Sequence, residues 1–147
     1  MTAQILDLPT PSTPGGAYRP VIVHQGLAYV SGQLPKRDDV VQFVGKVGDT
    51  VDIETARQAA RLCARQCLAA LEQALGDLAH LERLLKVTGF VACTPDFGQR
   101  PKVVDGASEY FIETLGARGE HARSAIGVLA LPRGASVEIE LIAALKA

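Results

Sequence analysis

The sequence predicts an α+β fold in which a mixed β-sheet carries two helices packed on one face. Apolar residues alternate in some segments and recur every three or four residues in others. These segments follow the order two strands, helix, strand, helix, two strands, without an internal repeat or linker. In the last segment, apolar residues alternate with Glu138 and Glu140, so one face of the sheet should belong to the core.

The first segment, residues 1–17, is rich in Pro and Gly, and we expect a turn-rich arm. Two β-type runs follow at 20–24 and 27–31, and the Gln25-Gly26 pair between them suits a tight hairpin. Residues 31–35 should end the second strand. A charged loop over 36–39 then leads to a weak apolar run over 40–44.

Residues 52–76 have the period of a long amphipathic helix, which Asp52 caps and Gly76 ends. Its apolar positions are Ile53, Ala56, Ala60, Cys63, Cys67, Leu71 and Ala74. Residues 84–93 indicate a mostly buried strand that ends before Pro95. A second helix should begin after Pro101 and end at Gly116.

Two strands, 122–130 and 136–145, are expected around a turn at 131–135. If they pair as a hairpin, Arg123 lies opposite Ala143 and Glu138 opposite Val128. Arg123 and Glu138 are then offset by roughly 17 Å along the ladder. A site that uses both needs a long ligand, a bulge or a neighbouring subunit. Both faces of 122–130 are small or apolar, which also indicates that another subunit covers this sheet.

The length of the chain indicates the number of domains, and its net charge limits the classes of partner that it could bind. The 147 residues suit one domain, 1–147, and a formal charge of −1 with no basic run beyond Lys36-Arg37 argues against nucleic-acid and membrane-surface binding. No apolar stretch reaches the about 20 residues of a spanning helix. Residues 1–8 do not resemble a signal peptide, so a cytoplasmic location is expected.

Common cofactor and metal motifs are absent from the sequence, and we expect neither a metal nor a cofactor. Cys63 and Cys67 lie four residues apart on the predicted helix and could share a metal, but small core residues are the preferred interpretation. The histidines are scattered and are expected to be structural or exposed; they are His24, His80 and His121.

Two charged residues are candidates for chemistry. Arg123 opens an otherwise uncharged strand, where its guanidinium must reach solvent, pair with a carboxylate of the protein or bind an anionic ligand. Glu138 is either a solvated strand residue or an acid or base that directs water. Spacing alone favours the structural alternative for both.

Five short motifs in the sequence resemble the Rid/YjgF family, the reactive intermediate deaminases, which are also labelled endoribonuclease L-PSP. They are Gly16-Ala17-Tyr18, residues 29–35 (YVSGQLP), Ala122-Arg123-Ser124, Leu131-Pro132 and residues 137–140 (VEIE). Residues 104–108 and 119–124 are more similar to a longer subgroup than to the founding RidA type.

The resemblance implies a fold like the small chorismate mutase of bacilli, assembled as a homotrimeric barrel with clefts between subunits. Members with activity hydrolyse 2-imino acids, tautomers of enamines, to 2-keto acids and ammonia without a cofactor. By similarity, Arg123 would bind the substrate carboxylate, Ser31 and Gly32 would contact the substrate, Tyr18 would close the cleft, and Glu138 would orient water.

Two positions depart from the founding deaminases, because Ala125 stands where they have a cysteine and Asp105 where they have an asparagine. A carboxylate at Asp105 could repel an anionic substrate. A non-catalytic module that binds a small carboxylate in the Arg123 cleft is therefore the alternative to an imine hydrolase. The charge balance argues against a ribonuclease.

Overall fold

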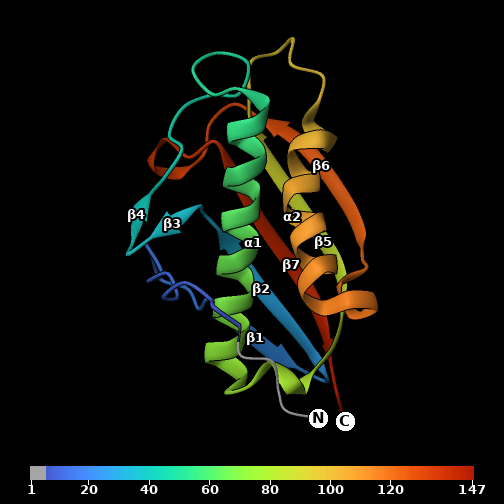
Figure 1. Ribbon diagram of the computed structural model, residues 1–147. Coiled ribbons are helices and arrows are strands. Elements are labelled where there is room, and N and C mark those ends of the chain that lie inside the picture. The colour runs from blue at the N-terminus through green and yellow to red at the C-terminus, as the bar shows by residue number, and fades with distance from the viewer. Residues whose placement is uncertain (1–5) are drawn as a thin grey trace.

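A five-stranded sheet and two long helices form the computed structural model, which describes residues 6–147 (Figure 1). The strands are β1 (Val21–His24), β2 (Leu27–Gln33), β5 (Leu81–Ala92), β6 (Ala122–Val128) and β7 (Val137–Leu145), and the helices are α1 (Ile53–Leu75) and α2 (Arg100–Leu115). Short 3₁₀ turns lie at Leu78–His80, Gly116–Gly119 and Pro132–Gly134. The N-terminal arm contains no helix or strand over residues 6–17, and residues 1–5 lie outside the described part.

Helix α1 begins and ends where the sequence predicts. The Asp52 side chain accepts a hydrogen bond from the backbone N–H of Thr55 at 2.8 Å, and Gly76 terminates the helix with a φ of 80°. Cys63 and Cys67 are both fully buried, and their thiols lie near carbonyl oxygens of β7. Their prediction as core residues is confirmed.

The strand order is β1-β2-β7-β5-β6, so the predicted hairpin between the last two strands is wrong. Strand β5 lies between β6 and β7 and is parallel to β6. Parallel neighbours need a crossover connection, which α2 provides, and the chain must then pass the end of β5 to add β7 on its other edge. The last two strands are neighbours along the chain but not in the sheet.

This order changes the expected geometry of the two charged candidates. Arg123 lies level with Val87 of β5, and Glu138 lies level with Phe90. Neither Arg123 and Ala143 nor Glu138 and Val128 are partners. Because side chains alternate along a strand, positions three apart on β5 belong to opposite faces. Arg123 therefore points to the helix side of the sheet, and Glu138 originates on the other side.

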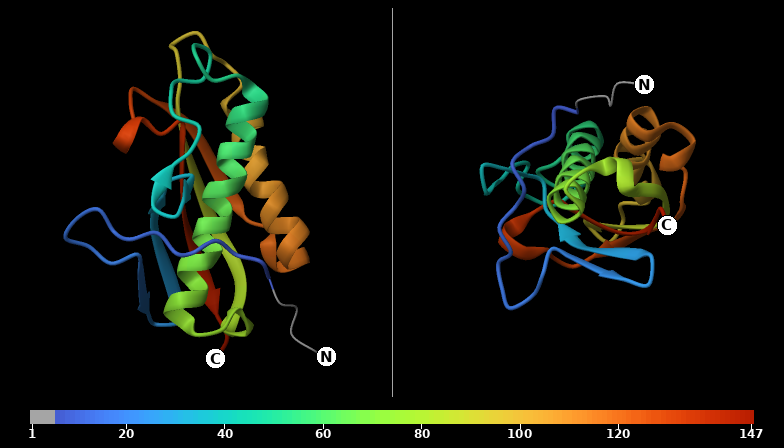
Figure 2. Two further views of the ribbon diagram at one scale, coloured as in Figure 1. Left: turned by 60° about the vertical axis from the view of Figure 1, so that its left-hand side comes forward. Right: turned by 90° about the horizontal axis from the view of Figure 1, so that it is seen from below.

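Both helices cover one face of the sheet, as the sequence predicts; the view from below in Figure 2 shows them on the same side. The alternation in β7 is confirmed, since Val137, Ile139 and Leu141 are buried against this side. No element of the described residues covers the opposite face. That face carries apolar side chains, of which Ile22, Tyr29 and Ile126 are each more than two-fifths exposed.

A small separate hairpin replaces the charged loop expected at 36–39. Strands β3 (Lys36–Arg37) and β4 (Val40–Val41) pair around Asp38 and Asp39, which have positive φ values of 49° and 62°. A two-residue turn of this hand suits the twist of a hairpin, and Asp tolerates it. The hairpin gives Lys36 a fixed, buried place at 4% exposure.

None of the helices in the described residues is long and apolar enough to cross a membrane.

Candidate functional site

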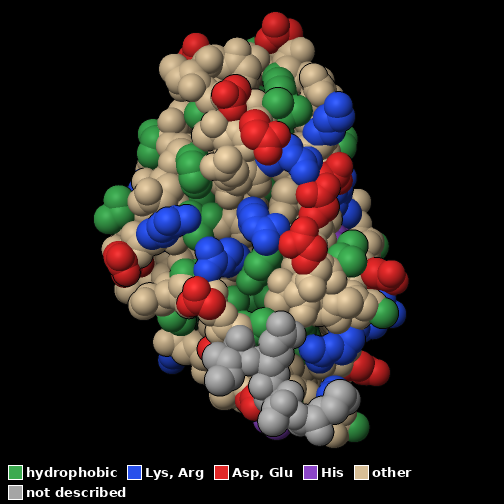
Figure 3. Space-filling view, in the orientation of Figure 1, with side chains coloured by type: hydrophobic (Ala, Val, Ile, Leu, Met, Phe, Trp, Pro, Cys, Tyr) green, Lys and Arg blue, Asp and Glu red, His purple; other side chains and the backbone are tan. Residues whose placement is uncertain are grey.

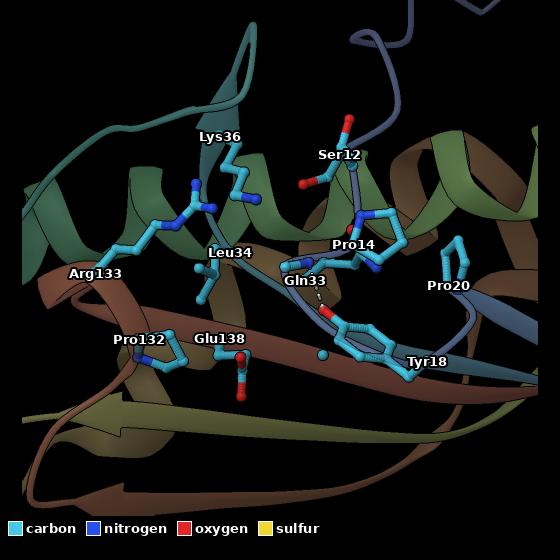
Figure 4. Close-up of a pocket in the computed structure, with 13 residues that line it drawn as sticks. Ser12, Pro14, Tyr18, Pro20, Gln33, Leu34, Lys36, Pro132, Arg133 and Glu138 are labelled. Carbon is cyan, nitrogen blue, oxygen red and sulfur yellow. Dashed lines mark hydrogen bonds between the residues drawn. The ribbon is translucent and has the colours of Figure 1, made fainter.

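A cavity of about 250 Å³ opens where the N-terminal arm, the end of β2, β3 and the start of β7 meet (Figure 4). The arm, the strands and the turn at Pro132–Gly134 that precedes β7 come from distant parts of the sequence. The lining residues are Ser12, Thr13, Pro14, Gly15, Tyr18, Pro20, Gly32, Gln33, Leu34, Lys36, Pro132, Arg133 and Glu138. Three residues implied by the family resemblance are therefore brought together: Tyr18, Gly32 and Glu138.

The side chain of Glu138 lies directly against the backbone of Gly32. A Cβ atom at Gly32 would sit 2.7 Å from Glu138 Cδ and 3.0 Å from both carboxylate oxygens. The register between β2 and β7 shifts from Val30 to Gln33, and this bulge presents Gly32 to the carboxylate. Only a residue without a side chain leaves room for Glu138 in this position.

The environment of Glu138 disfavours its charge. Burial raises the pKa of this carboxyl above the ordinary value of 4.5, and the negative charge of Glu140 raises it further. Within residues 6–147 the carboxylate accepts no hydrogen bond and forms no ion pair. A half-buried carboxylate without a partner is suited to bind and orient a water molecule.

Tyr18 borders the cavity at 51% exposure, and its hydroxyl accepts a long hydrogen bond of 3.4 Å from the N–H of Gly15. Ser31 does not line the cavity. Its hydroxyl donates to the carbonyl of Arg19 at 2.7 Å, and its N–H donates to that of Pro20. Ser31 therefore anchors the segment before β1 to the end of β2, beside the bulge.

Arg123 lies in a different cluster, between β6 and α2. Its Nη1 atom is 2.7 Å from Asp105 Oδ1 and donates to Ser108 Oγ at 3.2 Å, while Nη2 donates to the Pro101 carbonyl at 3.3 Å. The guanidinium is thus compensated by a carboxylate of its own chain. Of the alternatives for Arg123, the described chain realises an ion pair with the protein.

His121 extends this cluster. Its Nδ1 lies 2.6 Å from the Gly119 carbonyl and its Nε2 lies 2.9 Å from Ser108 Oγ. Burial lowers the pKa of the imidazole, the hydrogen bond to Gly119 opposes this shift, and the charge of Arg123 lowers the pKa further. In the neutral ring Nδ1 carries the proton, so Nε2 accepts from the Ser108 hydroxyl. His121 is therefore a structural member of the Arg123 cluster.

One chain does not bring the predicted site residues together. Arg123, Asp105 and Ala125 lie on the helix side of the sheet, and Ala125 packs against the core. The cavity with Gly32 and Glu138 opens at the start of β7, and Glu138 originates on the opposite side of the sheet. A site that uses both sets of residues within one chain is excluded by this arrangement.

Lys36 and Arg133 also line the cavity. The sequence does not predict either as a site residue, because Lys36 lies in an expected loop and Arg133 in an expected turn. The turn-forming pair Asp38-Asp39 before two valines is the signal that could have revealed the hairpin and fixed Lys36. Arg133 has a φ of 56°, and nothing in its sequence position predicts this geometry.

Gln66 of α1 supports the cavity wall and is also missed. It is fully buried, and its amide donates to the carbonyl of Lys36 at 2.8 Å and to that of Thr10 at 3.3 Å. Its oxygen accepts from the N–H of Ser12 at 3.2 Å. One side chain therefore joins the helix, β3 and the arm. Its place beside Cys67 on the predicted apolar stripe is the only signal in the sequence.

No group of three or more potential metal-ligating side chains occurs within residues 6–147. Burial raises the pKa of the Cys63 thiol well above its ordinary value, and it raises that of Cys67 as well. Both thiols are therefore protonated and unsuited to metal binding or nucleophilic attack.

The endoribonuclease L-PSP family model matches residues 10–145. Protein TCP17 of Trypanosoma cruzi is 36% identical over 138 residues, which cover 93% of this chain and 86% of that protein. A crystal structure of an Agrobacterium tumefaciens protein with unknown function is 43% identical with a TM-score of 0.87, over 88% of this chain and 83% of that one. The crystal structure of the E. coli YjgF gene product is 25% identical to this chain with a TM-score of 0.66. The match covers 93% of this chain and 94% of the YjgF chain.

These similarities span nearly the whole chain and agree with the arrangement of the sheet and its two helices. The predicted chorismate-mutase-like fold is thereby confirmed. The chain belongs to the endoribonuclease L-PSP family, the Rid/YjgF family that its sequence motifs resemble.

Proposed function

We propose that the protein hydrolyses reactive 2-imino acids, and the enamines that tautomerise to them, to 2-keto acids and ammonia without a cofactor. The observation that carries this proposal is the Glu138 carboxylate, which has no partner among residues 6–147 and is held against Gly32 in a cavity that Tyr18 borders. All three residues belong to motifs shared with the family. Glu138 would hold the attacking water, and its raised pKa would make the carboxylate a stronger base towards that water.

The complete site in this proposal lies between subunits of a homotrimer. Glu138, Gly32 and Tyr18 come from one subunit, and Arg123 with Asp105 and Ala125 comes from its neighbour. Two features of the single chain support this division: the two groups of residues are separated, and the sheet face without helices exposes apolar side chains. Such a face is typical of a buried subunit interface.

The reaction needs little from the protein because a protonated imine is already an electrophile. The water oxygen forms a bond to the imine carbon while Glu138 accepts a proton from that water. Glu138 then returns the proton to the nitrogen and accepts the hydroxyl proton of the addition product as the carbon–nitrogen bond breaks and the carbonyl forms. Glu138 passes this second proton to the departing ammonia, which leaves as ammonium. Proton transfer by one carboxylate contributes about 10²- to 10⁴-fold, and positioning contributes more. Arg123 would hold the substrate carboxylate.

A second candidate function is a non-catalytic module that binds a small carboxylate. The ion pair between Arg123 and Asp105 favours it, because a substrate carboxylate must compete with a carboxylate already 2.7 Å away. Ala125 also offers no polar group to the cleft.

Imine turnover distinguishes the two functions. An amino-acid oxidase generates 2-imino acids in the presence of semicarbazide, and a deaminase lowers the yield of trapped semicarbazone while keto acid accumulates. We expect the wild type to do so and Glu138→Gln to lose at least about 100-fold in rate. The control Glu72→Gln, which changes an exposed residue of α1 outside the cavity, should retain activity. A wild type that matches Glu138→Gln for every imine, yet is stabilised by small carboxylates, would establish the binding module instead.

A further inference from the structure

Lys36 is a buried cation that the proposed reaction does not use. Its side chain lines the cavity, and the residue is only 4% exposed. Within the described residues its ammonium group has no hydrogen-bond partner, and the nearest carboxylate oxygen, Asp39 Oδ1, is 3.9 Å away. Asp39 already accepts hydrogen bonds from the N–H and the hydroxyl of Thr13, at 2.9 and 2.8 Å. The charge of Lys36 is therefore poorly compensated.

Arg133 adds a second cation to the same wall of the cavity. In Figure 4 its guanidinium extends towards the end of the Lys36 side chain. Its hydrogen bond within the described residues is a long one of 3.5 Å from Nη1 to the carbonyl of Asp39. Burial lowers the pKa of Lys36, and the charge of Arg133 lowers it further. Two neighbouring cations that share no full counter-charge favour the binding of an anion.

Glu138 lies apart from these cations, below them in the view of Figure 4, and forms no ion pair with either in the described chain. A ligand whose imine carbon faces Glu138 thus has space to extend towards Lys36 and Arg133. The α-carboxylate is assigned to Arg123 of the neighbouring subunit in the proposed reaction. The cation pair is left for a different acidic group.

We infer that Lys36 and Arg133 bind a second carboxylate on the substrate, so that the preferred substrates are the imines of acidic amino acids. This inference rests on the proposed function for the reaction and adds its substrate class. A cavity of about 250 Å³ accommodates a small dicarboxylate such as 2-iminoglutarate. Two charge-assisted contacts would favour it over an imino acid with a neutral side chain.

The test compares the imines of glutamate and norvaline, generated by amino-acid oxidases, with wild type, Lys36→Met and the control Arg37→Met. Arg37 is the next residue in β3 and is exposed outside the cavity. We expect Lys36→Met to lower kcat/KM for the glutamate imine at least about tenfold more than for the norvaline imine. Equal losses for both imines, or no loss for either, would overturn the inference.

Binding without chemistry separates this inference from the proposed function. We expect glutarate to raise the Tm of wild type more than butyrate does, and Lys36→Met to abolish that difference. If the difference is found but no imine is hydrolysed, the subsite stands and the proposed function fails. If imines are hydrolysed but glutarate and butyrate act alike in both proteins, the function stands and the subsite is wrong.

Discussion

The cavity around Glu138 and the cluster around Arg123 differ in whether their charged side chains have partners within the chain. In the cavity, Glu138 has no partner among the described residues, and Lys36 has only a distant one. In the cluster, Arg123 is bound by Asp105, Ser108 and the Pro101 carbonyl. A buried charge without a partner lowers the stability of the fold, and a bound ligand of opposite charge can offset that loss. A charge that is paired within the chain does not carry this cost. In the proposed function, a ligand would supply missing counter-charges in the cavity, whereas in the cluster it would have to compete with Asp105 for Arg123.

The largest expected effect tests whether the two regions work together across a subunit interface. Glu138→Gln and Arg123→Ala should each be inactive alone, whereas trimers assembled from an equal mixture should recover about a quarter of the wild-type imine hydrolysis. The recovery arises because a quarter of the clefts would combine an intact Glu138 from one subunit with an intact Arg123 from its neighbour. Co-expression with two different tags isolates the mixed trimers, in which one cleft of three combines both intact residues, so these should recover about a third of the wild-type activity.

A mixture as inactive as its parents, from trimers shown by their tags to be mixed, would contradict a shared site. The control is a mixture of Glu138→Gln with itself under both tags, which should recover nothing.

The next effect concerns the cavity alone. Gly32→Ala places a methyl group 2.7 Å from Glu138 Cδ, so the carboxylate must move while the fold is retained. We expect kcat/KM to fall about 10- to 100-fold with little change in Tm. Gly98→Ala is the matched control, because nothing lies within 4 Å of the added carbon. Gly32→Ala with wild-type kinetics would show that the position of Glu138 does not matter.

A smaller effect of opposite sign is expected in the cluster. Asp105→Asn keeps the shape of the side chain but removes the charge that compensates Arg123. If Arg123 binds a carboxylate, its affinity for one should increase by up to about tenfold, measured as KM for an imino acid or as Kd for the keto acid. Ser108→Ala, which removes a neutral partner of the same guanidinium, should change the affinity less. Unchanged or weaker binding by Asp105→Asn would argue against contact between Arg123 and the ligand.

The smallest effect is on stability against pH. Because burial and Glu140 raise the pKa of Glu138 in the folded state, the folded protein holds this proton more tightly than the unfolded chain does. This contribution to stability is complete below pH 4.5 and is lost as the pH rises through the folded-state pKa. Glu138→Gln should therefore raise Tm at pH 7 by about 1–4 °C and leave it unchanged at pH 4. Thermal unfolding at the two pH values checks this; an equal shift at both would contradict it.

Charged side chains of both signs share the face of the molecule that carries the helices. Figure 3 shows Lys and Arg side chains interspersed with Asp and Glu over the helices, without a continuous basic field. Ion pairs contribute to this pattern, such as Arg57 with Glu109 and Arg61 with Glu113.

Local signals were sufficient for the helices, the first hairpin and the alternation in β7. Asp52 and Gly76 determine the ends of α1 through their own side chain and backbone, and Gln25 with Gly26 determines the turn between β1 and β2. These features depend on neighbours in the chain, so a single sequence contains them. Tyr18, Gly32 and Glu138 were identified by motif, and the cavity unites them.

Only the tertiary structure decided the rest. The insertion of β5 between β6 and β7 follows from the crossover through α2, a long-range requirement that no local pattern reports. That strand order separates Arg123 from Glu138 and pairs Arg123 with Asp105. Lys36 and Arg133 then line the same cavity as Glu138. The sequence by itself determined the elements and the chemical groups, because these depend on short-range geometry. Which groups meet depends on the order of the strands, which long-range pairing sets.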